Sequence, residues 1–203
     1  MPEGIALGFD TSAAHCAAAL LRGDRVLVQH HEAMARGQAE RLFPLLEQLL
    51  AEAGLNWRDL DVIGVGTGPG NFTGIRVAVA AARGLALSLG IPALGVAVTE
   101  AAAHGLPRPC RVVIPARREQ VIWQDFGTGA ANDAGGRPQQ AAAGALPPGP
   151  APAAPAIPLA EAIARLALER RDSPAQPRPA PIYLRPADAA PPREAGLVIL
   201  ERE

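Results

Sequence analysis

The sequence predicts an α/β fold in which three antiparallel strands are followed by parallel strands connected through helices. Three observations indicate this fold. A short apolar run at 5–9 ends in a polar turn, as a central strand does. A turn signal at 22–25 joins two further apolar segments into a hairpin. From 38 to 104, segments with helical periodicity alternate with short apolar runs, as in helical crossovers between parallel strands.

The first three strands are expected at residues 5–9, 17–21 and 26–30. The first runs into the polar turn Asp10-Thr11-Ser12. The other two flank Arg22-Gly23-Asp24-Arg25, whose glycine and aspartate favour a tight turn. We therefore expect an antiparallel hairpin beside the first strand.

The first helix is expected at residues 38–53. Its leucines fall on one face and its glutamates lie away from that face, which is the pattern of a helix packed on a core. Pro44 should bend this helix or mark a late start, because proline lacks the N–H of a helix interior. Gly54 is a plausible C-terminal stop.

The alternation continues through residue 104. A strand is expected at 60–65, followed by a glycine-rich loop and a helix at 73–89 that Thr73 can cap with its hydroxyl. Another strand at 92–96 and a short helix at 99–104 follow. This order is that of the ribonuclease-H-like folds, which include actin, hexokinase and acetate kinase.

Two domains are expected. Residues 1–105 form the first, which is intact, and residues 106–203 form a reduced second domain in which 112–126 contain a hairpin. Residues 127–158 are rich in Gly, Ala and Pro, and we expect a flexible insert that holds neither a long helix nor a central strand. After it, only 159–171 has a helical pattern.

The polar turn after the first strand is a candidate cofactor site. In the actin-like architecture this turn approaches the phosphates of a nucleotide, so Asp10, Thr11 and Ser12 are candidate cofactor-binding residues, and Asp10 can hold a metal-bound water. The alternative is an Asp/Ser turn that caps its own backbone. The motif alone does not decide between them.

The glycine loop from Gly66 to Gly74 also has two interpretations. Its backbone N–H groups, with Arg76, can cradle an anion. Alternatively, the glycines permit a tight turn and Phe72 fills a pocket in the core or in a partner. The chain contains no lysine, which excludes both the phosphate-binding lysine of a Walker A loop and Schiff-base chemistry.

The helix after this loop carries a face of small residues beside larger leucines. Together with the leucines of 38–53, this face predicts either a surface for a partner helix pair or burial against the chain's own sheet. The small residues are Ala78, Ala81, Ala82 and Gly84.

No catalytic or metal-binding residues are predicted. The serines lie in no nucleophile elbow, and the four histidines have no zinc spacing: His15, His30, His31 and His104. Cys16 and Cys110 are expected to be reduced, buried thiols. The net charge of −1 gives no field for nucleic acid, and no segment has the pattern of an export signal or membrane span, so we expect a cytoplasmic protein.

Five segments together resemble the TsaB (YeaZ) family, which belongs to the glycoprotease-like branch of the actin-like ATPase superfamily. They span nearly the whole chain, and the most specific is the Gly-Pro-Gly-x-Phe-Thr-Gly-x-Arg pattern. They are Phe9-Asp10-Thr11-Ser12, Arg41-Leu42-Phe43-Pro44, Gly66–Arg76, Ile114–Trp123 and Pro181-Ile182-Tyr183-Leu184-Arg185.

The resemblance implies a non-catalytic subunit of the complex that attaches a threonylcarbamoyl group to the anticodon-adjacent adenosine of tRNA. Such proteins pair with the catalytic paralogue TsaD, are joined by the ATPase TsaE, meet tRNA only through the complex and form homodimers when isolated. This chain alone is expected to hold no cofactor, with ATP or ADP and Mg possible at the joint interface. The implied interface residues are Leu42, Leu46, Gly68, Pro69, Gly70, Phe72, Thr73, Arg76, Ala78 and Ala82.

Departures from the family pattern agree with a non-catalytic role. The metal-binding histidines of the catalytic paralogue correspond to Val98 and Ala102. Pro115 stands where the family often has aspartate, so an acid that could face a nucleotide is missing, which argues against ATP binding by this chain. The chief alternative is a glycoprotease-like, metal- or ATP-dependent hydrolase of the same fold. A tRNA-binding module is a third possibility, but aromatic residues for base stacking are few.

Overall fold

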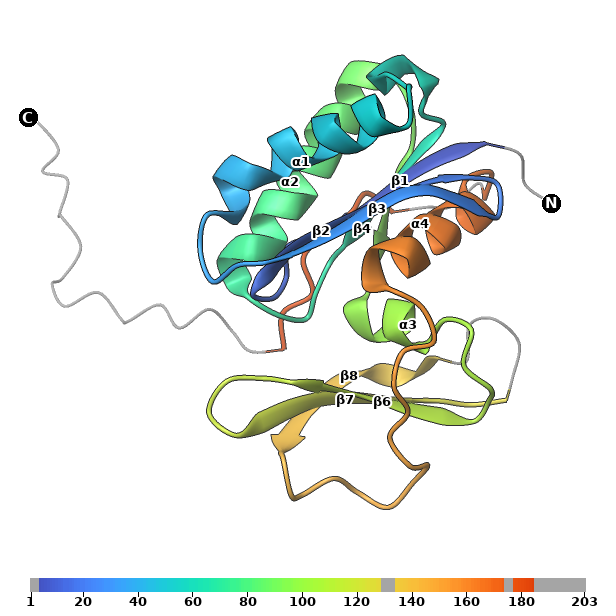
Figure 1. Ribbon diagram of the computed structural model, residues 1–203. Coiled ribbons are helices and arrows are strands. Elements are labelled where there is room, and N and C mark those ends of the chain that lie inside the picture. The colour runs from blue at the N-terminus through green and yellow to red at the C-terminus, as the bar shows by residue number, and fades with distance from the viewer. Residues whose placement is uncertain (1–3, 129–133, 174–176, 185–203) are drawn as a thin grey trace, which may run out of the picture.

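The computed structural model describes residues 4–128, 134–173 and 177–184. Its larger sheet has five strands in the order β3-β2-β1-β4-β5 (Figure 1). The strands β1, β2 and β3 are antiparallel, and β4 and β5 run parallel to β1, which confirms the predicted topology. The bounds are β1 Ile5–Asp10, β2 His15–Arg22, β3 Arg25–Ala33, β4 Val62–Gly66 and β5 Ala93–Val96.

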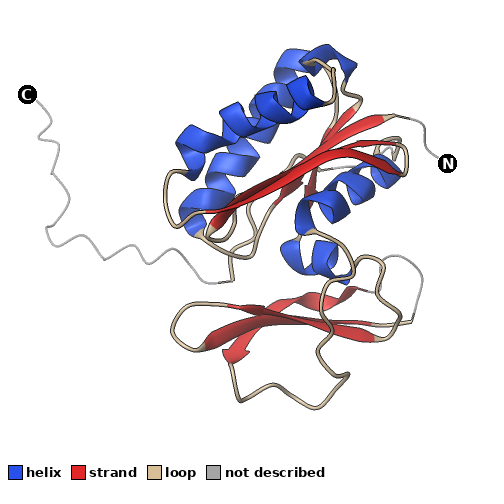
Figure 2. Ribbon diagram, viewed as in Figure 1, coloured by secondary structure: helices blue, strands red, loops and turns tan. Residues whose placement is uncertain are grey.

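Helices cover both faces of this sheet (Figure 2). Helices α1 (Gln38–Glu52) and α2 (Phe72–Leu89) lie on one face, and α4 (Leu159–Arg170) lies on the other. Side chains alternate along each strand, so Leu7 packs under α1 and α2 while Ala6 packs under α4. The core therefore has two layers, one on each side of the sheet.

The position of α4 differs from expectation, because its sequence was attributed to the second domain. It contacts β1, β2 and β4 of the first sheet. Glycines in two of these strands admit it closely: a Cβ at Gly8 would collide with the carbonyl of Ala160, and one at Gly64 would lie 2.7 Å from the carbonyl oxygen of Ile163. The division into two separately folding domains stays a prediction.

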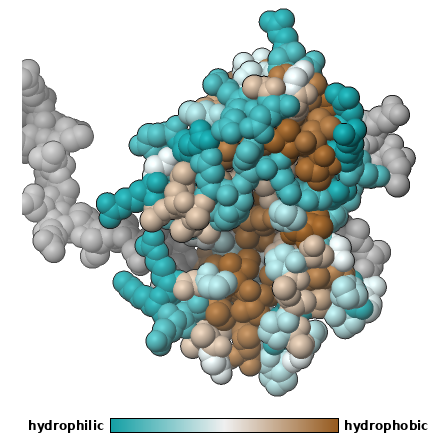
Figure 3. All heavy atoms as spheres, in the orientation of Figure 1, coloured by the Kyte–Doolittle hydropathy of each residue, from teal (hydrophilic) through white to brown (hydrophobic). Residues whose placement is uncertain are grey.

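A second, smaller sheet lies beyond helix α3 (Val98–Ala103), which sits between the two sheets (Figure 1). Its three antiparallel strands are β6 (Cys110–Pro115), β7 (Gln120–Phe126) and β8 (Ala134–Ala142), in that order. The β6–β7 hairpin was predicted. In the space-filling view, hydrophobic atoms reach the surface in this lower half of the molecule as well as in the upper half (Figure 3).

Strand β8 corrects the prediction of a flexible insert across 127–158, because residues 134–142 pair with β7. Their proline and glycines are compatible with this pairing for a physical reason. Strand β8 is at the edge of its sheet, where Pro138 can lie without removing a ladder hydrogen bond from a central strand. Gly136 has a φ of 76° where the register with β7 shifts.

The helix boundaries agree with expectation to within a few residues, but the cap of α2 does not. Asn71, not Thr73, is the N-cap: its side-chain oxygen accepts hydrogen bonds from the N–H groups of Thr73 and Gly74, at 3.0 and 3.3 Å. Asparagine is as good a cap as threonine, and the helix begins earlier than its apolar pattern indicates. Pro44 lies inside α1, which begins at Gln38, so Pro44 does not mark a late start; the bend stays a prediction.

Within the described part of the chain, α2 is the one helix long and apolar enough to cross a membrane by length and composition. It instead packs one face on the sheet, with Ile75, Ala78 and Ala82 in the core. Arg76 and Arg83 lie outside that core face, in exposed positions. Helix α2 is therefore a layer of this fold with an exposed outer face.

Candidate functional site

The turn after β1 is buried and tightly hydrogen-bonded. Asp10 is 0% exposed, and its Oδ2 accepts hydrogen bonds from the Ser12 backbone N–H at 2.9 Å and the Ser12 hydroxyl at 2.8 Å. His15 Nε2 lies 2.7 Å from the same oxygen. The Thr11 hydroxyl donates to the carbonyl of Gly74 at 2.7 Å. The polar side chains of this turn therefore make hydrogen bonds within the protein.

The glycine loop packs directly on this turn. A Cβ at Gly66 would collide with Asp10 Oδ1, one at Gly70 with the carbonyl of Ser12, and one at Gly74 with the carbonyl of Thr11. Glycine is thus required at three points because backbone meets backbone or carboxylate there. The tight-turn interpretation accounts for these three glycines.

One buried carboxylate oxygen of this turn takes part in none of these hydrogen bonds. Asp10 Oδ1 has no hydrogen-bond partner among the residues that the structure describes, and it faces the α-carbon of Gly66. The side chains of Asp10, Thr11 and Ser12 are all buried. Nucleotide or metal binding by them stays a prediction, and no cluster of three His, Cys, Asp or Glu side chains suited to a metal occurs in the described residues.

The arrangement of Ser12, His15 and Asp10 differs from that of a serine hydrolase. In a catalytic triad the histidine lies between serine and aspartate and removes the serine proton. Here Ser12 and His15 both contact the same oxygen of Asp10, so the serine hydroxyl donates to the carboxylate. The described geometry gives Ser12 no imidazole base.

Two positions that the resemblance matches to metal-binding histidines of a catalytic paralogue are apolar and buried. Val98 and Ala102 lie in α3 at 6% and 4% exposure. His104 follows the end of α3 and is half-buried. None of the three belongs to a candidate metal cluster in the described ranges.

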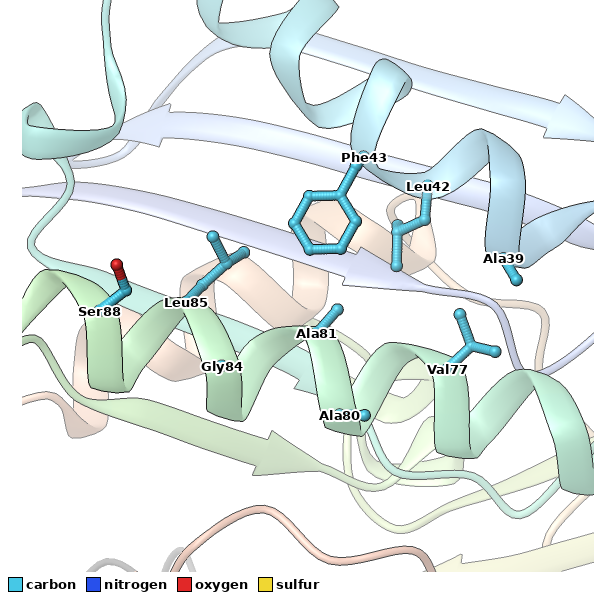
Figure 4. A pocket seen from close by; sticks show the side chains of 9 residues that line it. All are labelled: Ala39, Leu42, Phe43, Val77, Ala80, Ala81, Gly84, Leu85 and Ser88. Atoms are coloured by element: carbon cyan, nitrogen blue, oxygen red, sulfur yellow. The ribbon is translucent and has the colours of Figure 1, made fainter.

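An apolar groove of about 400 Å³ lies between α1 and α2 (Figure 4). Leu42 and Phe43 point from α1 toward α2, and Val77, Ala81 and Leu85 point back (Figure 4). Phe43 is 43% exposed although it is a large apolar residue. The full lining is Ala39, Leu42, Phe43, Val77, Ala80, Ala81, Gly84, Leu85 and Ser88.

Four of the expected interface residues are buried in the chain's own core, and their contact with a partner stays a prediction. Leu42, Leu46, Ala78 and Ala82 are each 0% exposed, because a helix in a layered fold uses one apolar stripe to pack on the sheet. Only Leu42 among these four reaches the groove, at its floor.

The expected interface residues of the glycine loop differ in their burial. Gly68 and Pro69 are buried, whereas Gly70, Phe72, Thr73 and Arg76 are exposed. Sequence reasoning also missed the groove residues Phe43 and Ala80. Their signal was available, since each lies beside the core stripe of its helix.

An exposed cluster of two aromatic rings and one arginine lies at the start of α2. The guanidinium carbon of Arg76 is 3.4 Å from the Phe72 ring centroid, and its Nε donates to the Tyr183 hydroxyl at 2.8 Å. The two rings are 5.3 Å apart. Tyr183 is held in place because the N–H of Ile182 donates to the carbonyl of Thr67. Arg185, the last residue of this motif, lies outside the described residues.

Comparison with known proteins places these features in a family. The sequence model of the family described as TsaD, tRNA N6-adenosine threonylcarbamoyltransferase, matches residues 28–167. An uncharacterized protein of Mycobacterium tuberculosis is 36% identical, over 91% of this chain and 93% of that protein. The tRNA threonylcarbamoyladenosine biosynthesis protein TsaB of Escherichia coli K12 is 33% identical, over 59% of this chain and 54% of that protein.

Solved structures give the same result. YeaZ from Pseudomonas aeruginosa superposes with a TM-score of 0.72 and 26% identity, over 89% of this chain and all of that chain. The predicted α/β, ribonuclease-H-like fold is therefore confirmed, with its mixed five-stranded sheet and a small second sheet. By sequence and by fold, the chain belongs to the TsaB (YeaZ) family, in the glycoprotease-like branch of the actin-like ATPase fold.

Proposed function

We propose that this chain is a non-catalytic, cytoplasmic subunit in threonylcarbamoyladenosine synthesis on tRNA, and that it docks on a TsaD-type transferase through α1 and α2. The observation that carries the proposal is the apolar groove between these helices. The names of the relatives supply the pathway and the class of partner.

The outer face of α2 has more apolar surface than a solvated helix needs. Its inner stripe already packs on the sheet through Ile75, Ala78 and Ala82. The outer face still presents Ala80, and Leu87 is 87% exposed. An exposed apolar patch of this kind marks an interaction site, and small residues let another backbone approach closely.

The residues of the site favour a non-catalytic role. The apolar Val98 and Ala102 cannot ligate a metal, and Ser12 has no imidazole base in the described geometry. A TsaD-type partner would therefore perform the transfer. Within the same proposal, a TsaE-like ATPase joins the pair, tRNA is met only through the complex, and ATP or ADP with Mg is held at the joint interface.

Homodimers of the isolated chain are part of the proposal. The exposed charges of the two helices are complementary: α1 carries Glu40 and Glu47, and α2 carries Arg76 and Arg83. A two-fold arrangement in which each α1 faces the other α2 would satisfy both pairs of charges. The same face would then be covered by the partner when it is present.

The test is co-purification of the chain with the TsaD-type protein of the same genome. Ala80→Arg should abolish the complex, because it places a charge in the groove at an exposed helical position that tolerates arginine. Ala145→Arg is the matched control, since Ala145 is exposed beyond the second sheet and away from the groove. Unchanged melting temperatures would show that both variants fold.

Binding that survives Ala80→Arg would mean that this face is not the docking site. Turnover of a peptide or of ATP by the pure chain would favour the hydrolase alternative. Restoration of threonylcarbamoyladenosine in tRNA by the complex, and by neither protein alone, would support the proposed role.

A further inference from the structure

Arg76 is unusually well fixed for an exposed arginine. Its guanidinium stacks on Phe72, and its Nε donates to Tyr183. Its two terminal nitrogens have no hydrogen-bond partner among residues 4–128, 134–173 and 177–184. Both aromatic rings are partly exposed, Phe72 at 41% and Tyr183 at 44%. The result is a preorganised, outward-facing pair of N–H donors.

On α2, this cluster lies one helical turn before the groove residue Ala80. Phe72, Arg76, Ala80 and Gly84 are spaced by four residues, so they lie on one side of α2. Ala80 and Gly84 line the groove. A partner segment that packs on this outer side of α2, over Ala80 and Gly84, would reach Arg76 near the start of the helix.

The charges around the groove favour an acidic group on that segment. The only charged residues of α2 are Arg76 and Arg83, both exposed. The opposite wall, α1, presents Glu40 and Glu47, while its Arg41 is paired with Glu32. An occupant with carboxylates facing α2 would satisfy the arginines, and the reverse arrangement would place like charges together.

We propose that Arg76 is the anion-binding end of the docking face and receives a side-chain carboxylate of the TsaD-type partner on its two terminal nitrogens, which have no partner within the described part of the chain. Tyr183 is a positioning residue that holds Arg76 through Nε, so the segment 177–184 is part of the docking machinery. This inference rests on the proposed function. Arginine with two exposed aromatic residues is the composition typical of binding hot spots.

The physical gain comes from preorganisation. A free arginine side chain loses rotamer freedom when it binds a carboxylate, and that loss weakens binding. Stacking on Phe72 fixes the plane of the guanidinium, and the bond to Tyr183 fixes its rotation. The planar fork then matches a carboxylate in a geometry that lysine cannot provide.

The experiment measures the affinity of the full chain for the TsaD-type partner by calorimetry at low and high salt. Arg76→Ala should weaken binding about tenfold and reduce its salt dependence, because it removes a charged hydrogen-bond donor. Arg22→Ala, which removes the same charge from the exposed end of β2, should change affinity less than twofold.

A double-mutant cycle tests the positioning role. Tyr183→Phe keeps the ring but removes the hydroxyl, and it should weaken binding about threefold. In the Arg76→Ala background the same change should have no further effect, since Tyr183 would act only through Arg76. A purely structural Tyr183 would weaken binding equally in both backgrounds, and that result would overturn the positioning role.

The outcomes separate this inference from the proposed function. If the wild-type chain does not bind the partner, the proposed function fails. If Ala80→Arg abolishes binding but Arg76→Ala behaves like Arg22→Ala, docking stands and the role of Arg76 is wrong. If the isolated chain binds tRNA and Arg76→Ala removes that binding, the anion is an RNA phosphate and the carboxylate assignment is overturned.

Discussion

A methyl group added at Gly84 should have opposite effects on the isolated chain and on its complex. Gly84 lies inside α2 and lines the groove. A Cβ built there meets no atom within 4 Å, and the residue has an ordinary helical backbone. In the isolated chain, Gly84→Ala therefore adds no clash and removes backbone freedom from the unfolded state.

The expected gain follows from helix propensity. Glycine in a helix interior is about 0.5–1 kcal/mol less favourable than alanine. The free energy of unfolding of the isolated chain should rise by that amount. For a chain of 203 residues, a gain of this size raises the melting temperature by about 1–4 °C.

In the complex, the same methyl group should be unfavourable, because it should weaken binding. If a partner helix packs on α2 at Gly84, the methyl group occupies space that the partner backbone needs. Overpacking of a close contact costs about 1–3 kcal/mol. Gly84→Ala should then weaken binding to the TsaD-type partner by roughly 5- to 150-fold.

The assay compares thermal melting of the dilute isolated chain with calorimetric titration of the partner. Gly90→Ala is the control, because Gly90 is the C-cap of the same helix with a φ of 71° and also has open space around it. That change should destabilise the chain, since alanine is strained at positive φ. A lower melting temperature for Gly84→Ala would refute the helix argument, and unchanged affinity would refute close packing at Gly84.

Three further changes test local features. Asn71→Ala should lower the free energy of unfolding by about 1 kcal/mol in chemical denaturation, because two N–H groups of α2 lose their acceptor. The hydrogen bond from Arg41 lowers the pKa of Glu32, so this pair stabilises the fold above the ordinary pKa of glutamate and loses that effect as pH falls. Glu32→Gln should flatten the acid limb of the stability curve. Burial raises the pKa of Cys16 to about 11, so iodoacetamide at pH 8 should label it only after unfolding, as mass spectrometry would detect.

The order of strands and helices was predictable because it rests on local periodicity. The leucines of α1 and the apolar run of β4 each repeat with the period of their element. The turn at Gly23 and Asp24 likewise depends only on neighbouring residues. These features survive in the structure with shifts of a few residues at their ends.

The faces of the helices were not predictable in the same way. Helix α2 is apolar on two sides, and periodicity does not say which side meets the sheet. Ala78 and Ala82 were chosen as interface residues but pack in the core, whereas Ala80 and Gly84 face the groove. Only the three-dimensional arrangement separates these two pairs.

The position of α4 was unpredictable for a related reason. Its contacts with β1 and β4 join residues about 100 or more apart in sequence, and no local pattern encodes such a pairing. Gly8 and Gly64 are the sequence features that reflect this contact, because α4 approaches the strands where these residues lack side chains. A glycine inside a strand indicates that another backbone approaches closely, but it does not identify which segment approaches.

The glycine loop and the docking face are parts of one structure. The N–H of Asn71 donates to the carbonyl of Ser12, and the Thr11 hydroxyl donates to the carbonyl of Gly74, so the start of α2 is anchored on the turn after β1. Asp10 in turn holds Ser12 through two hydrogen bonds. This anchoring sets where α2 begins and therefore where Arg76 lies near the start of that helix. The glycines of this motif, which would admit an anion in a phosphate loop, here admit the neighbouring turn, and under the proposed function the motif thereby positions α2 for partner recognition.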